Sequence, residues 1–198
     1  MVSSVNANGD VVVSADSLRI RAQGQQPTAN THEQMSAETQ DLLIRARSVA
    51  ADVADPELPF VTVEDLGILR AVRLEDNCIV AEVSPTYSGC TAVAVIEQSI
   101  LSALLDAGFN ARVQRVMSPA WTTDWITKTG RQKLLQNGIA PPVGDSAAKP
   151  VLFEKPSVTC PHCKSTATAL VSEFGSTPCK AQYRCKDCQE PFDYFKCH

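Results

Sequence analysis

Two Cys-x-x-Cys pairs near the C-terminus constrain the fold of this chain more than any other feature of its sequence. The first pair is Cys160 with Cys163, and the second is Cys185 with Cys188. Two thiolates at this spacing sit on one tight turn, and two such turns joined by β-hairpins form a tetrahedral site with four sulfur ligands. The segments 167–174 and 181–184 can supply the strands of such a ribbon.

A metal is also a structural need for this part of the chain. Residues 157–198 contain few large apolar side chains, so burial alone cannot hold them together. A closed site of four sulfurs predicts zinc, with iron in a rubredoxin-like site as the alternative. Cys179 and Cys197, with His198, are candidates for a second or transient metal site, and the alternative is that they are buried thiols and a free terminus.

Composition describes an ordinary globular protein. The chain has 198 residues, of which 44% are hydrophobic and 20% charged, and it carries a formal net charge of −4. That charge predicts no general attraction to nucleic acid or to an anionic membrane. The sequence shows neither a signal-peptide pattern nor an apolar run of transmembrane length, so we expect a cytoplasmic location, where the eight cysteines stay reduced and indicate metal or thiol chemistry.

Hydrophobic periodicity and turn residues divide the chain into four parts. Residues 1–34 are polar without a sustained period and are expected to be a disordered leader. Residues 35–140 predict an α/β domain, 141–156 a proline-containing linker, and 157–198 the four-cysteine ribbon. We therefore expect an α+β fold, with a small mixed sheet and helices, followed by a zinc-ribbon-like β domain.

Within residues 35–140, several elements stand out. A helix is predicted from an N-cap at Ser36 to just before Asp55, and a second one lies on the apolar stripe that ends at Gly108. Segments 68–74 and 78–83 read as a β-hairpin, and 111–117 reads as a third strand. A further helix is expected over 127–136. This order favours helices packed on one face of the sheet.

One cysteine outside the ribbon is placed for chemistry. Cys90 follows Gly89 where a strand turns into a helix, and the positive end of the helix dipole there favours a thiolate. The alternative is a small buried residue at a helix start. Asp55 and Glu57 lie on a loop bracketed by prolines, for which turn chemistry is the simpler explanation.

Several segments together resemble a known family. Residues 55–59, 63–68 and 85–90 resemble the iron–sulfur assembly domain shared by SufT and the eukaryotic cytosolic targeting factors. With residues 118–125, 138–142 and 190–198 added, the chain is similar to the PaaD (or PaaJ) family, small proteins encoded with the bacterial phenylacetyl-CoA ring epoxidase. The resemblance covers about residues 36–198.

The resemblance implies a role in aerobic phenylacetate catabolism. It also implies that the protein helps build or deliver the metal centres of the epoxidase, whose reductase component carries an iron–sulfur cluster. The family's functional cysteine falls on Cys90 and its acidic loop residue on Asp55, which implies transient iron or iron–sulfur binding there. A cluster usually needs four ligands, so a second copy of Cys90 in a homodimer or ligands from a partner would have to contribute.

Three other functions compete with an accessory role. The chain could be a non-catalytic structural subunit of the multicomponent oxygenase. A catalytic di-iron subunit is not expected, because the sequence has no Glu-x-x-His pair and its three histidines are His32, His162 and His198. A nucleic-acid module is disfavoured as well, since residues 151–198 hold six Lys or Arg against five Asp or Glu, or +1.

Overall fold

The computed structural model describes residues 36–87, 89–90, 92–143 and 157–196, and the backbone of two short strands near the N-terminus. These are β1 (Ser4–Val5) and β2 (Val11–Val12), which pair antiparallel. The rest of the leader expected over 1–34 lies outside the described residues, as do Cys197, His198 and most of the linker expected over 141–156. The chain divides into two compact units, Met1–Gln34 and Met35–His198.

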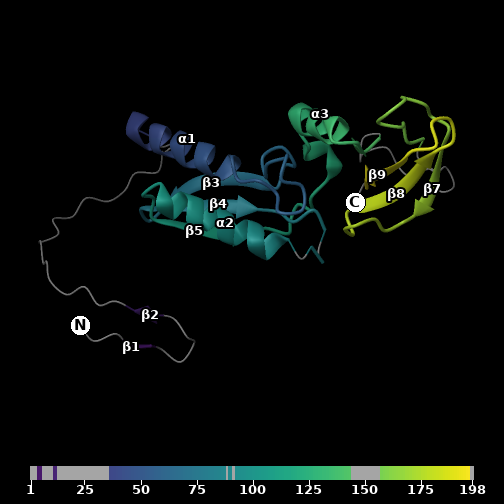
Figure 1. Cartoon of the computed structure of the whole chain (residues 1–198). Helices are drawn as coiled ribbons and strands as arrows, with labels where there is room; N and C mark the ends of the chain where they lie inside the picture. The colour runs from purple at the N-terminus through teal and green to yellow at the C-terminus, as the bar shows by residue number, and fades with distance from the viewer. Residues whose placement is uncertain are drawn as a thin grey trace, which may run out of the picture. The chain divides into compact units, whose positions relative to one another are not determined.

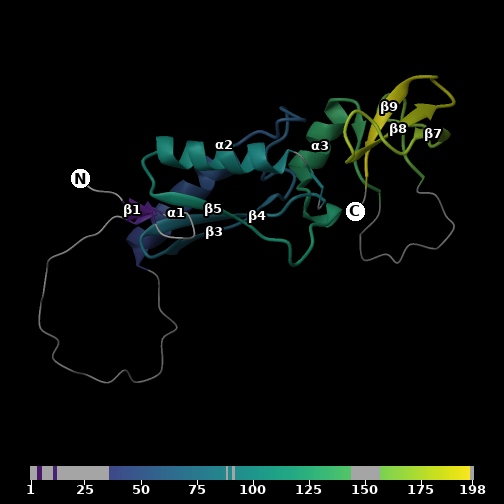
Figure 2. The ribbon, with the colours of Figure 1, turned by 90° about the horizontal axis from the view of Figure 1, so that it is seen from below.

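The second unit begins with a small mixed sheet, as the sequence predicted. Its elements are α1 (Ala37–Ala51), β3 (Leu69–Glu75), β4 (Cys78–Val83), α2 (Val93–Asp106) and β5 (Ala111–Arg115). The strand order is β3-β4-β5, in which β3 and β4 form an antiparallel hairpin and β4 and β5 are parallel. A parallel pair needs a crossover, and α2 supplies it, running along β5 in Figures 1 and 2.

Both helices cover the same face of this sheet. From β4, alternate residues Ile79, Ala81 and Val83 enter one apolar cluster, because side chains alternate along a strand. The same cluster holds buried side chains from both helices, namely Ala46, Ala50, Ile96, Ile100 and Leu104. The opposite face is charged, with Arg73 paired to both Glu75 and Glu82.

Local sequence explains where the helices begin and end. The hydroxyl of Ser36 accepts a hydrogen bond from the amide of Thr39 at 3.2 Å, so α1 has a side-chain cap. Gly108 follows α2 at a φ of +84°, a conformation that glycine adopts without strain. In contrast, the N-cap residue of α2 is Ala92, whose side chain cannot cap the helix, so the first amides of α2 are available to other acceptors.

A third helix is tied to the loop that precedes β3. The carboxylate of Asp65 pairs with Lys133 of α3 (Lys128–Gln136) at 2.5 Å. Gly67 has a φ of +66°, and a Cβ added there would lie 2.5 Å from the backbone oxygen of Trp125 in the short helix η1 (Thr123–Trp125). Glycine is therefore required at this close approach.

The C-terminal part forms a second sheet with strand order β6-β9-β8-β7. Its strands are β6 (Ile139–Ala140), β7 (Thr168–Ser172), β8 (Lys180–Cys185) and β9 (Pro191–Phe195). The expected strand segments contain β7 and most of β8, whereas β6 and β9 were not predicted. β6 comes from before the expected linker and pairs parallel with β9, so the ribbon sheet includes residues from both sides of it. The domain boundaries themselves stay a prediction.

Among the described residues, no helix combines the length and the apolar character needed to span a membrane.

Candidate metal centres

The four ribbon cysteines converge on one point. Their sulfur atoms all lie within 4.8 Å of one another, with Cys160 3.8 Å from Cys188 and Cys163 3.5 Å from Cys185. A tetrahedral metal bound at about 2.3 Å to each sulfur would hold the sulfurs about 3.8 Å apart. These separations are too long for a disulfide and fit a four-sulfur metal site.

The two turns that carry these cysteines are built alike. The residue after the second cysteine of each pair has a positive φ, 66° at Lys164 and 65° at Gln189. The amide of the first cysteine bonds to the carbonyl five residues later, Cys160 to Ser165 at 2.8 Å and Cys185 to Glu190 at 3.0 Å. This repeated geometry turns both pairs of sulfurs toward one centre.

Backbone amides prepare at least one of these thiols to bind a cation. Hydrogen bonding from the amide of Cys188, assisted by that of Asp187 and by neighbouring thiols and opposed by burial, lowers the pKa of Cys185 to about 7. A thiolate is the form that binds metal.

The second candidate centre lies around the acidic loop and Cys90. One carboxylate oxygen of Asp55 accepts hydrogen bonds from the amides of Glu57 and Leu58, at 2.8 and 2.9 Å. Asp55 is buried, and that burial raises its pKa, although the two amides and Lys180 oppose the change. Asp55 therefore fixes the shape of the loop that carries Glu57.

Cys90 is half-buried beside this loop. Its amide bonds to the carbonyl of Tyr87 at 3.2 Å, and a Cβ added at Gly89 would lie 3.1 Å from the Tyr87 ring, so a small residue is favoured there. The site thus begins as a tight turn that places Cys90 just before the N-terminus of α2.

The expected thiolate at Cys90 is not what the structure favours, and this is a correction. Burial raises the pKa of Cys90, and the carboxylates of Glu57 and Asp55 raise it further. The amides of Ala92 and Val93 act in the expected direction, since their hydrogen bonds lower the pKa, but they are outweighed. The free thiol is therefore mainly protonated at neutral pH.

Cys179 is the residue whose position the sequence did not foresee. It is a buried residue just before the ribbon strand β8, and its sulfur lies 3.9 Å from a carboxylate oxygen of Glu57. The only available signal was a cysteine outside the two Cys-x-x-Cys pairs. Its expected pairing with Cys197 stays a prediction, because Cys197 lies outside the described residues.

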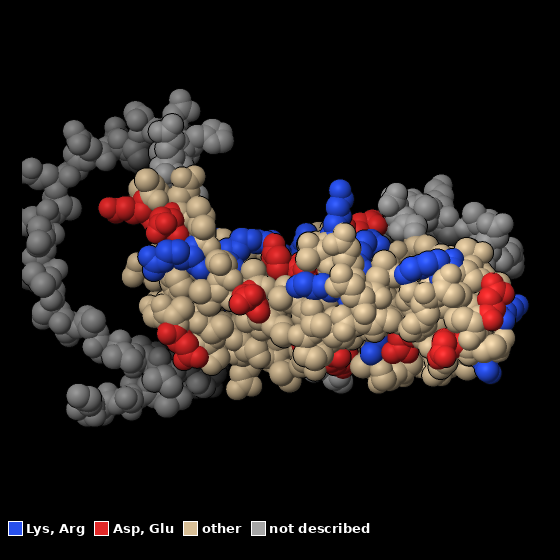
Figure 3. Space-filling view, turned by 45° about the horizontal axis from the view of Figure 1, so that its top comes forward, with Lys and Arg blue, Asp and Glu red and all other residues tan. Residues whose placement is uncertain are grey.

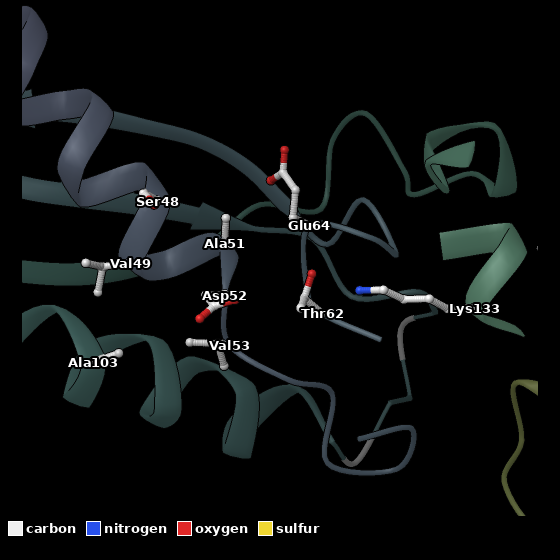
Figure 4. A pocket seen from close by; sticks show the side chains of 9 residues that line it. All are labelled: Ser48, Val49, Ala51, Asp52, Val53, Thr62, Glu64, Ala103 and Lys133. Carbon is white, nitrogen blue, oxygen red and sulfur yellow. The ribbon is translucent and has the colours of Figure 1, made fainter. Parts of the chain in front are cut away.

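An open groove of about 800 Å³ lies away from all of these thiols. It is bounded by the end of α1, by Thr62 and Glu64, by Ala103 of α2, and by Lys133. Figure 4 shows the Lys133 side chain reaching from α3 toward Thr62. None of the described cysteines lines this groove, so it is separate from the thiol chemistry.

Family models divide the chain, in agreement with the two sheets of its second unit, into an iron–sulfur assembly domain and a β-ribbon metal domain. The family model described as "Iron-sulfur cluster assembly protein" matches residues 47–116, and the one described as "PaaD zinc beta ribbon domain" matches residues 145–196.

A curated relative identifies the family more closely. The chain is 45% identical over 151 residues to a protein of Escherichia coli (strain K12) that is named as one of the subunits of a "Putative 1,2-phenylacetyl-CoA epoxidase". The similarity covers 76% of this chain and 90% of the relative. The chain belongs to the family of that relative, the PaaD family.

Two solved structures are also similar. One is the domain of unknown function DUF59 from Bacillus anthracis, at 21% identity and a TM-score of 0.46, covering 49% of this chain and 94% of that one. The other is Rv1466 from Mycobacterium tuberculosis, titled as a protein associated with [Fe-S] complex assembly and repair, at 30% identity and a TM-score of 0.31, covering 54% of this chain and 94% of that one. Both TM-scores are below 0.5, so neither similarity bears on the function.

Proposed function

We propose that this protein is an accessory factor of the phenylacetyl-CoA ring epoxidase that helps assemble or deliver an iron or iron–sulfur centre of that complex. The observation that supports it most is the position of Cys90, half-buried between an acidic loop and the start of α2. A thiol beside carboxylates is suited to iron, which accepts both ligand types. The client would be the iron–sulfur reductase component, and the compartment the cytoplasm.

The raised pKa of Cys90 suits temporary binding. Iron must displace the thiol proton before it can bind, so a raised pKa weakens the net affinity at neutral pH. A weakly held ion can pass to a client with stronger ligands. The ribbon has the opposite character, because four sulfurs hold a closed site, and we assign it a permanent zinc with iron as the alternative.

Surface charge is compatible with a protein client. On the face drawn in Figure 3, basic and acidic side chains lie interspersed on a mainly uncharged surface. Such a face does not create the single-sign field that would attract a phosphate backbone. Contact with another epoxidase component, or with a second copy of this chain, is the interaction that we propose.

Co-production with the reductase tests the proposal. The reductase is produced with the wild-type chain, with Cys90→Ser, with Cys78→Ser as a matched control on β4, or alone, and iron and acid-labile sulfide are counted per reductase. We expect full loading with wild type and Cys78→Ser, and cluster-poor reductase with Cys90→Ser. Equal loading in all four samples would reject a maturation role.

The alternative is a non-catalytic structural subunit, which the membership of the PaaD family also supports. An epoxidase whose metal centres are already loaded separates the two functions. A structural subunit would raise the activity of that complex when added back, whereas a maturation factor would leave it unchanged.

A further inference from the structure

The ribbon contributes a thiol to the neighbourhood of Cys90. The loop before β8 brings the Cys179 sulfur to 3.9 Å from a carboxylate oxygen of Glu57, which belongs to the acidic loop. Cys179 belongs to the apolar cluster of the assembly domain, against which Cys90 also packs, and not to the separate cluster that contains the ribbon cysteines Cys160 and Cys185. Two cysteines far apart in the sequence therefore border the same acidic loop.

The same charged neighbours act on both thiols. The carboxylates of Glu57 and Asp55 raise the pKa of both Cys90 and Cys179. Both thiols in turn raise the pKa of the Tyr87 phenol, in addition to the larger effect of its burial. The group is thus one local environment, made by the acidic loop, the turn before α2 and the ribbon.

The carboxylates of Glu57 and Asp55 act on both thiols, whereas the nearby cations Lys180 and Arg115 are each paired with a further carboxylate. Lys180 lies close enough to Cys179 to lower its pKa, but burial and the two carboxylates raise it overall. The ammonium of Lys180 is itself 3.4 Å from Asp193 in β9, which takes part of its charge. A cation bound between the thiols and Glu57 would offset the charge of these carboxylates.

We propose that Cys179 completes the site at Cys90, so that Cys90, Cys179 and the carboxylate of Glu57 together bind a ferrous ion. This inference rests on the proposed function and supplies ligands that a single thiol lacks. Binding replaces the two thiol protons with the metal, and both protons go to solvent without any electron transfer. Asp55 is a positioning residue here, because its carboxylate holds the loop amides that orient Glu57.

Two sulfurs and one carboxylate also define the class of ion. Thiolates favour iron, cobalt or zinc over magnesium or calcium, and the carboxylate suits the divalent state. Among the described residues, only the four ribbon cysteines bring their ligand atoms within 4.8 Å of one another, so Cys90, Cys179 and Glu57 have to draw closer together to share one ion. The cost of that rearrangement weakens the net affinity, which fits transient binding.

Cobalt titration of the full-length, zinc-loaded protein without oxygen tests this inference. Co²⁺ bound to thiolates absorbs in the near ultraviolet, and zinc released to solution is measured in the same sample to detect exchange at the ribbon. Wild type and the control Cys78→Ala should bind about one Co²⁺ beyond the retained zinc. Cys90→Ala, Cys179→Ala and Glu57→Gln should each weaken that binding by more than about tenfold. Loss of a residue that only supports a metal ligand already lowers metal affinity by about tenfold or more.

Together with the reductase-loading experiment, the same variants distinguish failure of this inference from failure of the proposed function. Cobalt binding by Cys179→Ala equal to that of Cys78→Ala would overturn the inference, and the proposed function would stand if Cys90→Ser still left the reductase cluster-poor. Cobalt binding that needs both cysteines, with a fully loaded reductase in Cys90→Ser, would support the site and reject the maturation role. Cys179→Ser, which keeps the side-chain size, replaces Cys179→Ala if the latter loses its zinc.

Discussion

The indole ring of Trp121 lies against the phenyl ring of Phe195, with centroids 6.3 Å apart and planes inclined at 57°. Trp121 belongs to the segment between β5 and η1, and its ring nitrogen donates to the carbonyl of Leu66 at 2.9 Å. Phe195 ends the last ribbon strand and is 1% exposed. The ribbon is therefore anchored in the core of the assembly domain, which holds Cys179 beside the acidic loop.

Removing this anchor should destabilise the whole second unit. Phe195→Ala should lower the free energy of unfolding by about 3–5 kcal/mol, because a fully buried ring leaves a cavity. Urea titration followed by circular dichroism measures the change. The matched control is Phe174→Ala, an exposed ring that contacts the Lys196 ammonium at 4.4 Å in a cation–π geometry, for which we expect less than about 1 kcal/mol. Similar losses in both variants would contradict a shared core.

Metal removal should loosen the ribbon first. After treatment with a chelator, hydrogen exchange of the amides of β8 should accelerate more than that of β4, because the four sulfurs hold the two turns together. Cys185→Ser should have the same effect without a chelator. Unchanged protection of β8 after complete metal loss would show that the metal has no structural role.

The pair formed by Asp65 and Lys133 should make stability depend on pH. Burial opposes the charge on Asp65, but hydrogen bonds from Lys133 and from the amide of Thr62 outweigh it and lower its pKa from 3.8. Because the pKa of Asp65 is lower in the folded state than in the unfolded chain, the stabilisation is fully present above the unfolded pKa. It is lost as the pH falls through the folded pKa. Asp65→Asn should cost about 1–3 kcal/mol at pH 7.

Thermal unfolding at several pH values checks this expectation. The deficit of Asp65→Asn should shrink at pH values below 3.8, where wild type also loses the charge. The control is Asp41→Asn, whose exposed pair with Arg45 at 3.6 Å should contribute little at any pH. A deficit that stays constant with pH would mean that the charge of Asp65 is not what stabilises α3.

Alkylation should report the protonation of Cys90. Burial and the acidic loop raise the pKa of Cys90 above 9.0, the ordinary pKa of a cysteine thiol. The rate of iodoacetamide labelling should therefore reach half of its maximum above pH 9.0. Glu57→Gln removes one nearby negative charge and should move that midpoint to lower pH. Mass spectrometry of the peptide that contains Cys90 gives the rate, and a midpoint below pH 9.0 would restore the thiolate expected from the helix dipole.

Sequence reasoning succeeded where the determining interactions are local. The helices, the hairpin and the turn at Gly108 follow from periodicity and from capping residues. It missed β6, because a two-residue strand has no periodic pattern of its own. It also missed the contact between Cys179 and Glu57, which joins residues 122 positions apart.

The protonation state of Cys90 shows a different limit of prediction from the sequence. Its place before a helix was predicted correctly, since a strand, a turn and a helix start can all be read from the sequence. The direction of its pKa change was wrong, because the helix-dipole argument includes the nearby amides but omits burial by residues from elsewhere in the fold.

Direct transfer of iron is the measurement closest to the central claim. The purified chain is loaded with isotopically labelled ferrous iron without oxygen, mixed with the metal-free reductase component, and separated from it, and the label on each protein is counted. Wild type and Cys78→Ser should pass the label to the reductase, while Cys90→Ser should pass none above the level of free iron. Equal transfer by Cys90→Ser, or label that stays on the wild-type chain, would contradict delivery through Cys90.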